Sequence, residues 1–198
     1  MSLSAPPRSA NASDEQHPRR RELPALLLLA VIAVVVGGGY LVTTALAEPA
    51  GPPVDVGRAV RLQPLSGWAV AEHGPRSIRL TRGGGNLDAV LGTASSAPQL
   101  LTRYLHLLDR SPSQVSLSPT VTSVTLDSGL HGLRASYVGL IPSREVTSVE
   151  GEITAVVLPD GTGVIFDGWA PKGLFSYVDR DLERMTASAQ IAPGGEVP

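Results

Sequence analysis

The longest apolar stretch of the chain runs from Leu23 to Ala47 and contains 25 residues without a charged side chain. A helix of that length reaches about 37 Å, whereas the hydrocarbon layer of a membrane is about 30 Å thick. A helix buried in a protein core is rarely apolar on every face for so long. The pattern therefore predicts a transmembrane helix over residues 23–47.

The segments on either side of this stretch predict its orientation. Three arginines at 19–21 precede it, and no basic residue follows until Arg58. The positive-inside rule then keeps the N-terminus in the cytoplasm and everything after the helix outside. Residues 1–22 have too few apolar side chains to form a core, so we expect a disordered tail. Residues 48–57 hold three prolines and two glycines, which is typical of a short linker.

The end of the apolar stretch also fits a second interpretation. Ala45 and Ala47 stand where a signal peptidase reads its A-x-A pattern, and cleavage after Ala47 would release the rest of the chain. The apolar region of a signal peptide, however, is about 7–15 residues long, which is shorter than this stretch. An uncleaved anchor is favoured, and a secreted protein remains the alternative.

Beyond the linker, short segments alternate between apolar and polar residues. In Arg76–Arg82, Ile78 and Leu80 share one side, and the polar residues take the other. Short Gly- and Asp-rich turns separate successive segments, which indicates antiparallel neighbours. The expected strands are Ser66–Glu72, Arg76–Arg82, Leu87–Thr93, Thr120–Leu126, Leu133–Ile141, Val146–Leu158 and Gly163–Trp169.

Two segments have helical spacing instead. The first follows a cap at Ser95 or Ser96, and its apolar stripe is Leu100, Leu101, Tyr104, Leu105 and Leu108. The second begins near Pro171, and its apolar face is Leu174, Val178, Leu182 and Met185. The order of strands, helix, strands and helix predicts an α+β domain over residues 58–193, with an antiparallel sheet and helices packed on its faces. A disordered tail, 194–198, is expected to follow.

Composition narrows the choice of partners and chemistry. The chain has 198 residues, 18 of them acidic and 16 basic, so it has no excess positive charge to suggest a nucleic-acid partner. It has no cysteine, which excludes disulfides, thiolate metal sites, a cysteine nucleophile and lipid attachment at a cysteine. Lys172 is its only lysine, and this arginine bias suggests a GC-rich bacterial gene.

The histidines offer little support for a metal site. His17 lies in the predicted tail, and His106 lies beside the apolar stripe of the first helix, where a partly exposed structural role is favoured. His73 and His131 lie in turns, and no HExxH motif occurs. A metal site shared by these two histidines and an acid such as Asp127 is the less favoured alternative.

Other candidate residues have both a structural and a functional interpretation. Glu150 and Glu152 point the same way from one strand and could bind a cation or do acid–base work, although a solvated sheet edge is favoured. Trp68 is expected in the core. Trp169 is either a packing residue at the end of a strand or an exposed ligand anchor. No GxSxG motif occurs, and we assign no catalytic, cofactor-binding or metal-binding residue.

Two stretches resemble PsbP-like domains. The stretch Leu62–Trp68, LQPLSGW, is similar to the opening of that family, where a proline shortly precedes Gly-Trp, although Leu65 and Ser66 intervene here. The stretch Asp127–Tyr137, DSGLHGLRASY, is similar to a family hairpin. The resemblance covers about residues 60–191 and implies an antiparallel sheet with helices against its faces. Family members include an extrinsic subunit of photosystem II and a Ran-binding protein, which implies binding and assembly rather than catalysis.

These patterns together predict a non-enzymatic, single-pass membrane protein of the bacterial cell envelope. Its outer domain would bind an envelope protein or a small ligand and would need no cofactor. An envelope enzyme with an unrecognised site and a purely structural spacer are the alternatives. A charged pocket that holds His131, Glu150 or Asp127 would favour the enzyme, and an apolar cleft or a bare sheet face would favour binding.

Overall fold

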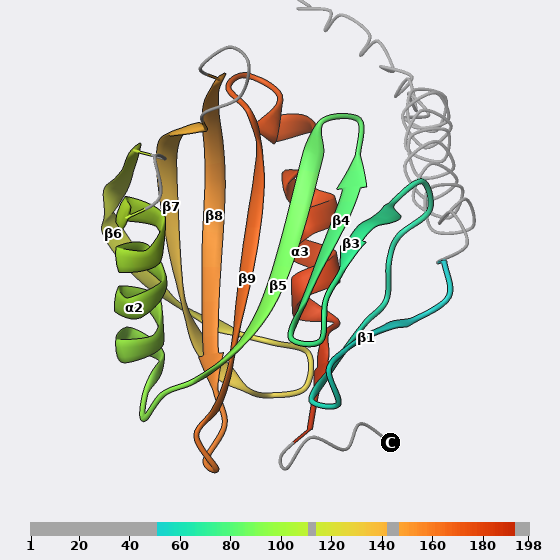
Figure 1. Ribbon diagram of the computed structural model, residues 1–198, viewed down its shortest axis with the longest axis vertical. Helices are drawn as coiled ribbons and strands as arrows, with labels where there is room; N and C mark the ends of the chain where they lie inside the picture. The colour runs from blue at the N-terminus through green and yellow to red at the C-terminus, as the bar shows by residue number, and fades with distance from the viewer. Residues whose placement is uncertain (1–50, 111–113, 142–146, 193–198) are drawn as a thin grey trace, which may run out of the picture. The chain divides into compact units, whose positions relative to one another are not determined.

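A seven-stranded antiparallel sheet forms the centre of the computed structural model, which describes residues 51–110, 114–141 and 147–192 (Figure 1). Five of its six neighbouring pairs join strands that are consecutive along the chain, as the alternating pattern predicts. From one edge to the other the strands are β3 (Ala69–His73), β4 (Ser77–Arg82), β5 (Gly85–Thr93), β9 (Thr162–Pro171), β8 (Thr147–Val157), β7 (His131–Ile141) and β6 (Gln114–Thr125).

Two helices cover opposite faces of this sheet (Figure 1). Helix α2 (Ala97–Arg110) packs on one face, and helix α3 (Asp179–Ala187) packs on the other after a 3-10 turn, η2 (Phe175–Tyr177). The alternation along β9 separates the two cores, because Phe166 belongs to the α3 side and Ile165 to the α2 side. The predicted α+β class is therefore confirmed.

Helix α2 follows the predicted pattern closely. The side chain of Ser96 accepts a hydrogen bond from the backbone N–H of Gln99 at 3.4 Å, so it caps the helix start. Leu100 and Leu101 are buried, and the other members of the predicted stripe are half-buried. His106 is exposed.

A second, three-stranded sheet corrects the predicted linker. Strand β1 (Val54–Val56) pairs with β2 (Val60–Leu62), which also pairs with β10 (Gln190–Ile191). Val56 is fully buried, so the fold includes residues assigned to the linker 48–57 and begins by Val54 rather than Arg58. The segment was assigned to a linker because of its prolines and glycines, although Val54 and Val56 alternate with Asp55 as in a strand.

The last helix starts later than its apolar spacing suggested. Strand β9 ends at Pro171, and Gly173 has a φ of +82°, which is not a helical conformation. Helix α3 begins only at Asp179. Leu174 is consequently 43% exposed and does not share the buried face of Leu182. The other two members of that predicted face are buried, as expected.

The predicted membrane segment lies outside the part of the chain that the structure describes. Within residues 51–110, 114–141 and 147–192 no helix is both long and apolar enough to cross a membrane. The predicted tail 1–22, the span 23–47 and residues 194–198 lie outside the described residues, as do the first residues of the predicted linker.

Candidate functional site

A cavity of about 290 Å³ lies between the second half of α2 and the sheet. One part of its lining is apolar, with Gly139 among side chains of Leu108, Val115, Leu140, Ile141 and Val149. The other part is polar or aromatic and consists of Arg79, Asp88, Tyr104, Tyr137, Asp167 and Trp169. A concave, mostly apolar site with a few converging polar groups is the usual form of a small-ligand site.

Asp167 is the most deeply buried of these polar groups, with 3% of its surface exposed. Its two carboxyl oxygens accept hydrogen bonds from two tyrosines, Tyr104 on α2 and Tyr137 on β7, each at 2.8 Å. The two hydroxyls satisfy a carboxyl group that would otherwise be costly to bury. They also tie the helix to two strands of the sheet.

A glycine on the intervening strand allows one of these bonds to form. Gly151 on β8 pairs with Tyr137 on one side and with Trp169 on β9 on the other. A Cβ atom at position 151 would lie 2.5 Å from the Cζ atom of Tyr137, which is far too close for a real contact. The missing side chain therefore lets the tyrosine ring cross β8 and reach Asp167.

A second layer of charge borders the tyrosines. Arg79 donates to both oxygens of Asp88, at 2.7 and 3.2 Å, and its third nitrogen donates to Glu72 at 3.0 Å. The indole N–H of Trp169 also donates to Asp88, at 3.1 Å. Bidentate pairing of this kind fixes the guanidinium and carboxylate planes relative to each other.

Burial changes the proton affinity of the central groups. The pKa of Asp167 is raised to about 7, chiefly by loss of water, although the two tyrosine hydrogen bonds act to lower it. The negative charge of Asp88 raises it further, and the positive charge of Arg79 lowers it. Burial, and then the charge of Asp167, raise the pKa values of Tyr104 and Tyr137, so both phenols stay protonated. The cavity thus contains a carboxyl group that titrates near neutral pH.

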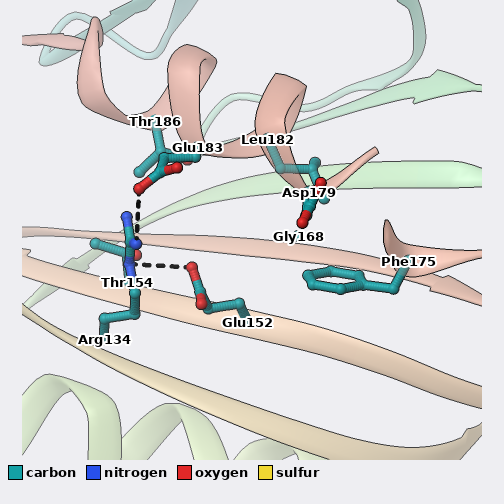
Figure 2. A pocket seen from close by; sticks show the side chains of 9 residues that line it. All are labelled: Arg134, Glu152, Thr154, Gly168, Phe175, Asp179, Leu182, Glu183 and Thr186. Carbon is teal, nitrogen blue, oxygen red and sulfur yellow. Dashed lines mark hydrogen bonds and ion pairs between the residues drawn. The ribbon is translucent and has the colours of Figure 1, made fainter. Parts of the chain in front are cut away.

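A smaller cavity of about 140 Å³ lies under α3, on the opposite face (Figure 2). Arg134 on β7 stands between Glu152 on β8, at 3.0 Å, and Glu183 on α3, at 3.1 Å. Its buried Nε atom faces Glu152 without the alignment of a hydrogen bond. Burial raises the pKa of Glu152, whereas the charge of Arg134 lowers it. The cluster of Arg134, Glu152 and Glu183 links α3 to the sheet, and its charges are largely paired.

The comparison with solved structures bears on the fold. The solution structure of cyanobacterial PsbP (CyanoP) from Synechocystis sp. PCC 6803 matches with 12% sequence identity and a TM-score of 0.51, over 74% of this chain and 94% of that one. The described domain has a PsbP-like fold. The Ran-binding protein Mog1p of Saccharomyces cerevisiae matches with 11% identity and a TM-score of 0.49, over 73% and 96%. No family model matches this sequence, and no match is found among the curated proteins.

In this PsbP-like domain the histidines are not brought together. His73 is exposed on the edge strand β3, where its Nε2 lies 3.1 Å from the carbonyl oxygen of Asp55. His131 is exposed on β7, near the other edge, with its Nδ1 3.0 Å from the hydroxyl of Thr125. In the described part of the chain no group of three or more His, Cys, Asp or Glu residues could hold a metal ion.

The expected position of the glutamate pair was wrong. Glu150 and Glu152 lie on β8, which has β9 and β7 on its two sides, so they do not lie at a sheet edge. Both are half-buried on the α3 face, and Glu152 is paired with Arg134. The pairing neutralises a charge that a bound cation would otherwise have to balance.

The two tryptophans occupy different cores. Trp68 is buried, as expected, and its indole N–H donates to Asp181 on α3 at 3.1 Å. Trp169 is half-buried on the α2 side and lines the larger cavity. It is therefore a cavity residue rather than an exposed anchor.

Five polar groups of the larger cavity were not anticipated as site residues from the sequence: Arg79, Asp88, Tyr104, Tyr137 and Asp167. One signal was present, because Asp167 is the only charged residue in the run Gly163–Ala170, which otherwise reads as a buried strand. A charged residue inside such a run is rarely buried without a partner. The identity of that partner could not be derived from local spacing.

Proposed function

We propose that this chain is a membrane-anchored, extracytoplasmic binding module of the bacterial cell envelope, and that its PsbP-like domain holds a small ligand between α2 and the sheet. The observation that carries the proposal is the larger cavity, in which two tyrosines, two aspartates and Trp169 converge beside an apolar wall. A pocket of about 290 Å³ is at the small end of the range for ligand sites. A ligand much smaller than a typical drug molecule would fill it.

The location rests on the sequence. The charge-free stretch 23–47 is long enough to cross a membrane, and the arginines that precede it favour a cytoplasmic N-terminus. The domain would then be held outside, close to the membrane. Secretion after cleavage following Ala47 is the alternative to this location.

The burial of Asp167 supports a binding role rather than catalysis. Both of its oxygens are occupied by tyrosine hydroxyls, so a reactant would have no direct access to the carboxyl group. A general base must reach the proton that it removes, directly or through one water. In addition, neither described cavity on the two helix-covered faces is lined by His131, Glu150 or Asp127.

An acid–base enzyme is the second candidate, because one observation favours it. A buried carboxyl group with a pKa of about 7 beside two phenols is the kind of perturbed group that active sites contain. In that case a tyrosine hydroxyl would have to relay the proton of Asp167. Turnover of a bound ligand by the purified protein would favour this candidate.

The anchor is tested by the membrane topology of the full chain. We expect a C-terminally tagged protein, expressed in a bacterial host, to stay in the membrane fraction until detergent is added, because its apolar stretch spans the bilayer. Protease added from outside should remove the tagged domain. A tagged product that starts at Glu48 and leaves the membrane would instead establish the secreted form.

The binding role is tested by thermal stability in the presence of small molecules. We expect at least one class of small polar compound to raise the melting temperature of the detergent-purified full chain, since a ligand at 100 times its Kd stabilises a protein by about 2.7 kcal/mol. Gly151→Ala should abolish the effect, because the new methyl group displaces Tyr137. Gly51→Ala is the matched control, because its Cβ would meet only ordinary contacts at 3.7 and 3.8 Å. A broad panel of cations, anions and neutral compounds without any such shift would refute the binding role.

A further inference from the structure

The phenol and indole hydrogen-bond donors around the larger cavity already have acceptors. Tyr104 and Tyr137 each have a single O–H, and both donate to Asp167. Trp169 has a single N–H, which donates to Asp88. Arg79 uses three of its five N–H groups in hydrogen bonds to carboxylates. Most of the unused hydrogen-bonding groups on the polar side are therefore acceptors, namely lone pairs of the phenol oxygens and of the Asp88 carboxylate.

The charges on the same side are unbalanced. Asp88 and Asp167 line the cavity with two carboxyl groups, and Arg79, the cation that lines it, pairs with Asp88. When Asp167 is ionised, these three groups have one more negative charge than positive. The mutual repulsion of the two aspartates contributes to the raised pKa of Asp167, as the effect of Asp88 on this group indicates. A positive charge in the cavity would relieve that repulsion.

We propose that the larger cavity binds a small organic ammonium ion with a short apolar substituent. This inference rests on the proposed function and names the chemical class of its ligand. The ammonium N–H groups would donate to the phenol oxygens of Tyr104 and Tyr137, which place the positive charge next to the carboxyl of Asp167. The substituent would lie against Leu108, Ile141 and Val149 on the apolar side.

Aromatic side chains add to this preference. Tyr104, Tyr137 and Trp169 all line the cavity, and the face of an aromatic ring attracts a nearby cation. A desolvated cation gains more from such rings than an exposed one does. An anion of equal size would meet the excess of carboxyl groups, and a neutral alcohol would gain neither the charge nor the ring contribution.

Binding of a cation should depend on pH through Asp167. The groups facing it that carry charge or titrate are Asp88 on β5, Arg79 on β4, Tyr104 on α2 and Tyr137 on β7, and the two phenols stay neutral. Because the pKa of Asp167 is about 7, roughly one protein in eleven has the ionised carboxyl at pH 6 and roughly ten in eleven have it at pH 8. Affinity for a cation should therefore rise about tenfold between these pH values.

The experiment is calorimetric titration of the full chain in a non-ionic detergent with three probes of similar size, butylammonium, 1-butanol and butyrate. We expect butylammonium to bind roughly tenfold or more tightly than the alcohol at pH 8, because hydrogen bonds to charged groups are the stronger ones. Butyrate should not bind measurably. At pH 6 the ammonium affinity should fall about tenfold, with release of a proton on binding.

Two variants separate this site from the other cavity. Asp167→Asn should remove the pH dependence and weaken ammonium binding at pH 8 about tenfold, because it removes one negative charge next to the ligand. Glu183→Gln removes the same charge from the cavity under α3 and should change neither the affinity nor its pH dependence.

A third variant reports on the cavity directly. Trp68→Phe leaves Trp169 as the only tryptophan, so the fluorescence of Trp169 should change on ammonium addition.

The outcomes distinguish the inference from the function on which it rests. Tighter binding of the alcohol or of butyrate would overturn the ammonium class and leave a ligand site in place. Loss of binding in Glu183→Gln, with Asp167→Asn unchanged, would move the site to the α3 face and overturn the inference. Failure of all three probes to bind would overturn the inference, and the broader thermal panel would then decide the binding role by itself.

Discussion

Replacing Leu182 by aspartate is expected to unfold the domain. Leu182 lies on α3 with 5% of its surface exposed, and its side chain covers Gly168 on β9. A Cβ atom at position 168 would lie 3.0 Å from a methyl carbon of this leucine, so the leucine packs directly against the sheet. Burying an unpaired carboxylate there costs several kcal/mol, which is comparable to the 5–15 kcal/mol that holds a typical domain together.

Circular dichroism of the detergent-purified full chain measures this effect, as loss of the β-sheet signal at a temperature where the wild-type domain is folded. The matched control is Arg180→Asp, which places the same side chain at an exposed position in the first turn of the same helix. An aspartate there interacts favourably with the helix dipole and should leave the melting temperature nearly unchanged. Equal melting temperatures for the two variants would show that Leu182 is not buried against the sheet.

The long regular elements could be predicted because their signals are local. Strand β4 alternates cleanly, and the glycines that follow it supply the turn into β5. Strand order is different, because it depends on which hairpins meet after the chain has folded. The pairing of β5 with β9 joins residues more than seventy positions apart, as in the register of Ala89 with Phe166. For that reason Glu150 and Glu152 were assigned to an edge, although β8 lies inside the sheet.

Short elements were missed for a related reason. Strand β1 has three residues, and its alternation of Val54 and Val56 is too brief to outweigh two preceding prolines. The pairing partner that makes it a strand, β2, is equally short. At the other end of the domain, Leu174 has helical spacing relative to Val178, but Gly173 with its positive φ lies just before it and the helix begins later. In both places tertiary context overrides a weak local signal.

The candidate site could be predicted only in fragments. Asp167 was visible as a charge in a buried run, and Tyr104 was counted as part of the apolar stripe of α2. The bonds that join them span 63 positions along the chain for Tyr104 and 30 for Tyr137. No spacing rule links residues that far apart. The crossing of Tyr137 over Gly151 depends on the register of three strands, which a single sequence does not give.

The second large effect is expected from Asp167→Asn, as a change in how stability depends on pH. The pKa of this carboxyl is near 4 in an unfolded chain and is raised to about 7 by burial in the folded domain. Between these values the folded state keeps the proton and the unfolded state has lost it, so wild-type stability falls as pH rises. The fall amounts to about 1.4 kcal/mol per pH unit, or on the order of 4 kcal/mol in total.

The asparagine variant should lack this contribution. Its amide cannot ionise, and one tyrosine O–H loses its acceptor, which costs about 1 kcal/mol at every pH. The two melting curves should therefore cross. The variant should be slightly less stable than wild type at pH 4.5 and more stable at pH 8, where the difference in melting temperature should be on the order of 10 °C.

Tyr104→Phe is the matched control, because it also removes one hydrogen bond at Asp167 but leaves the titrating group in place. It should be less stable than wild type and should keep the fall in stability between pH 4.5 and 8. Loss of this hydrogen bond removes an influence that lowers the pKa of Asp167, so the fall should extend to a slightly higher pH. Parallel stability–pH curves for wild type and Asp167→Asn would mean that the carboxyl ionises in the folded domain as readily as in water. The carboxyl would then have to be open to solvent, and the closed arrangement of two tyrosines around it would be wrong.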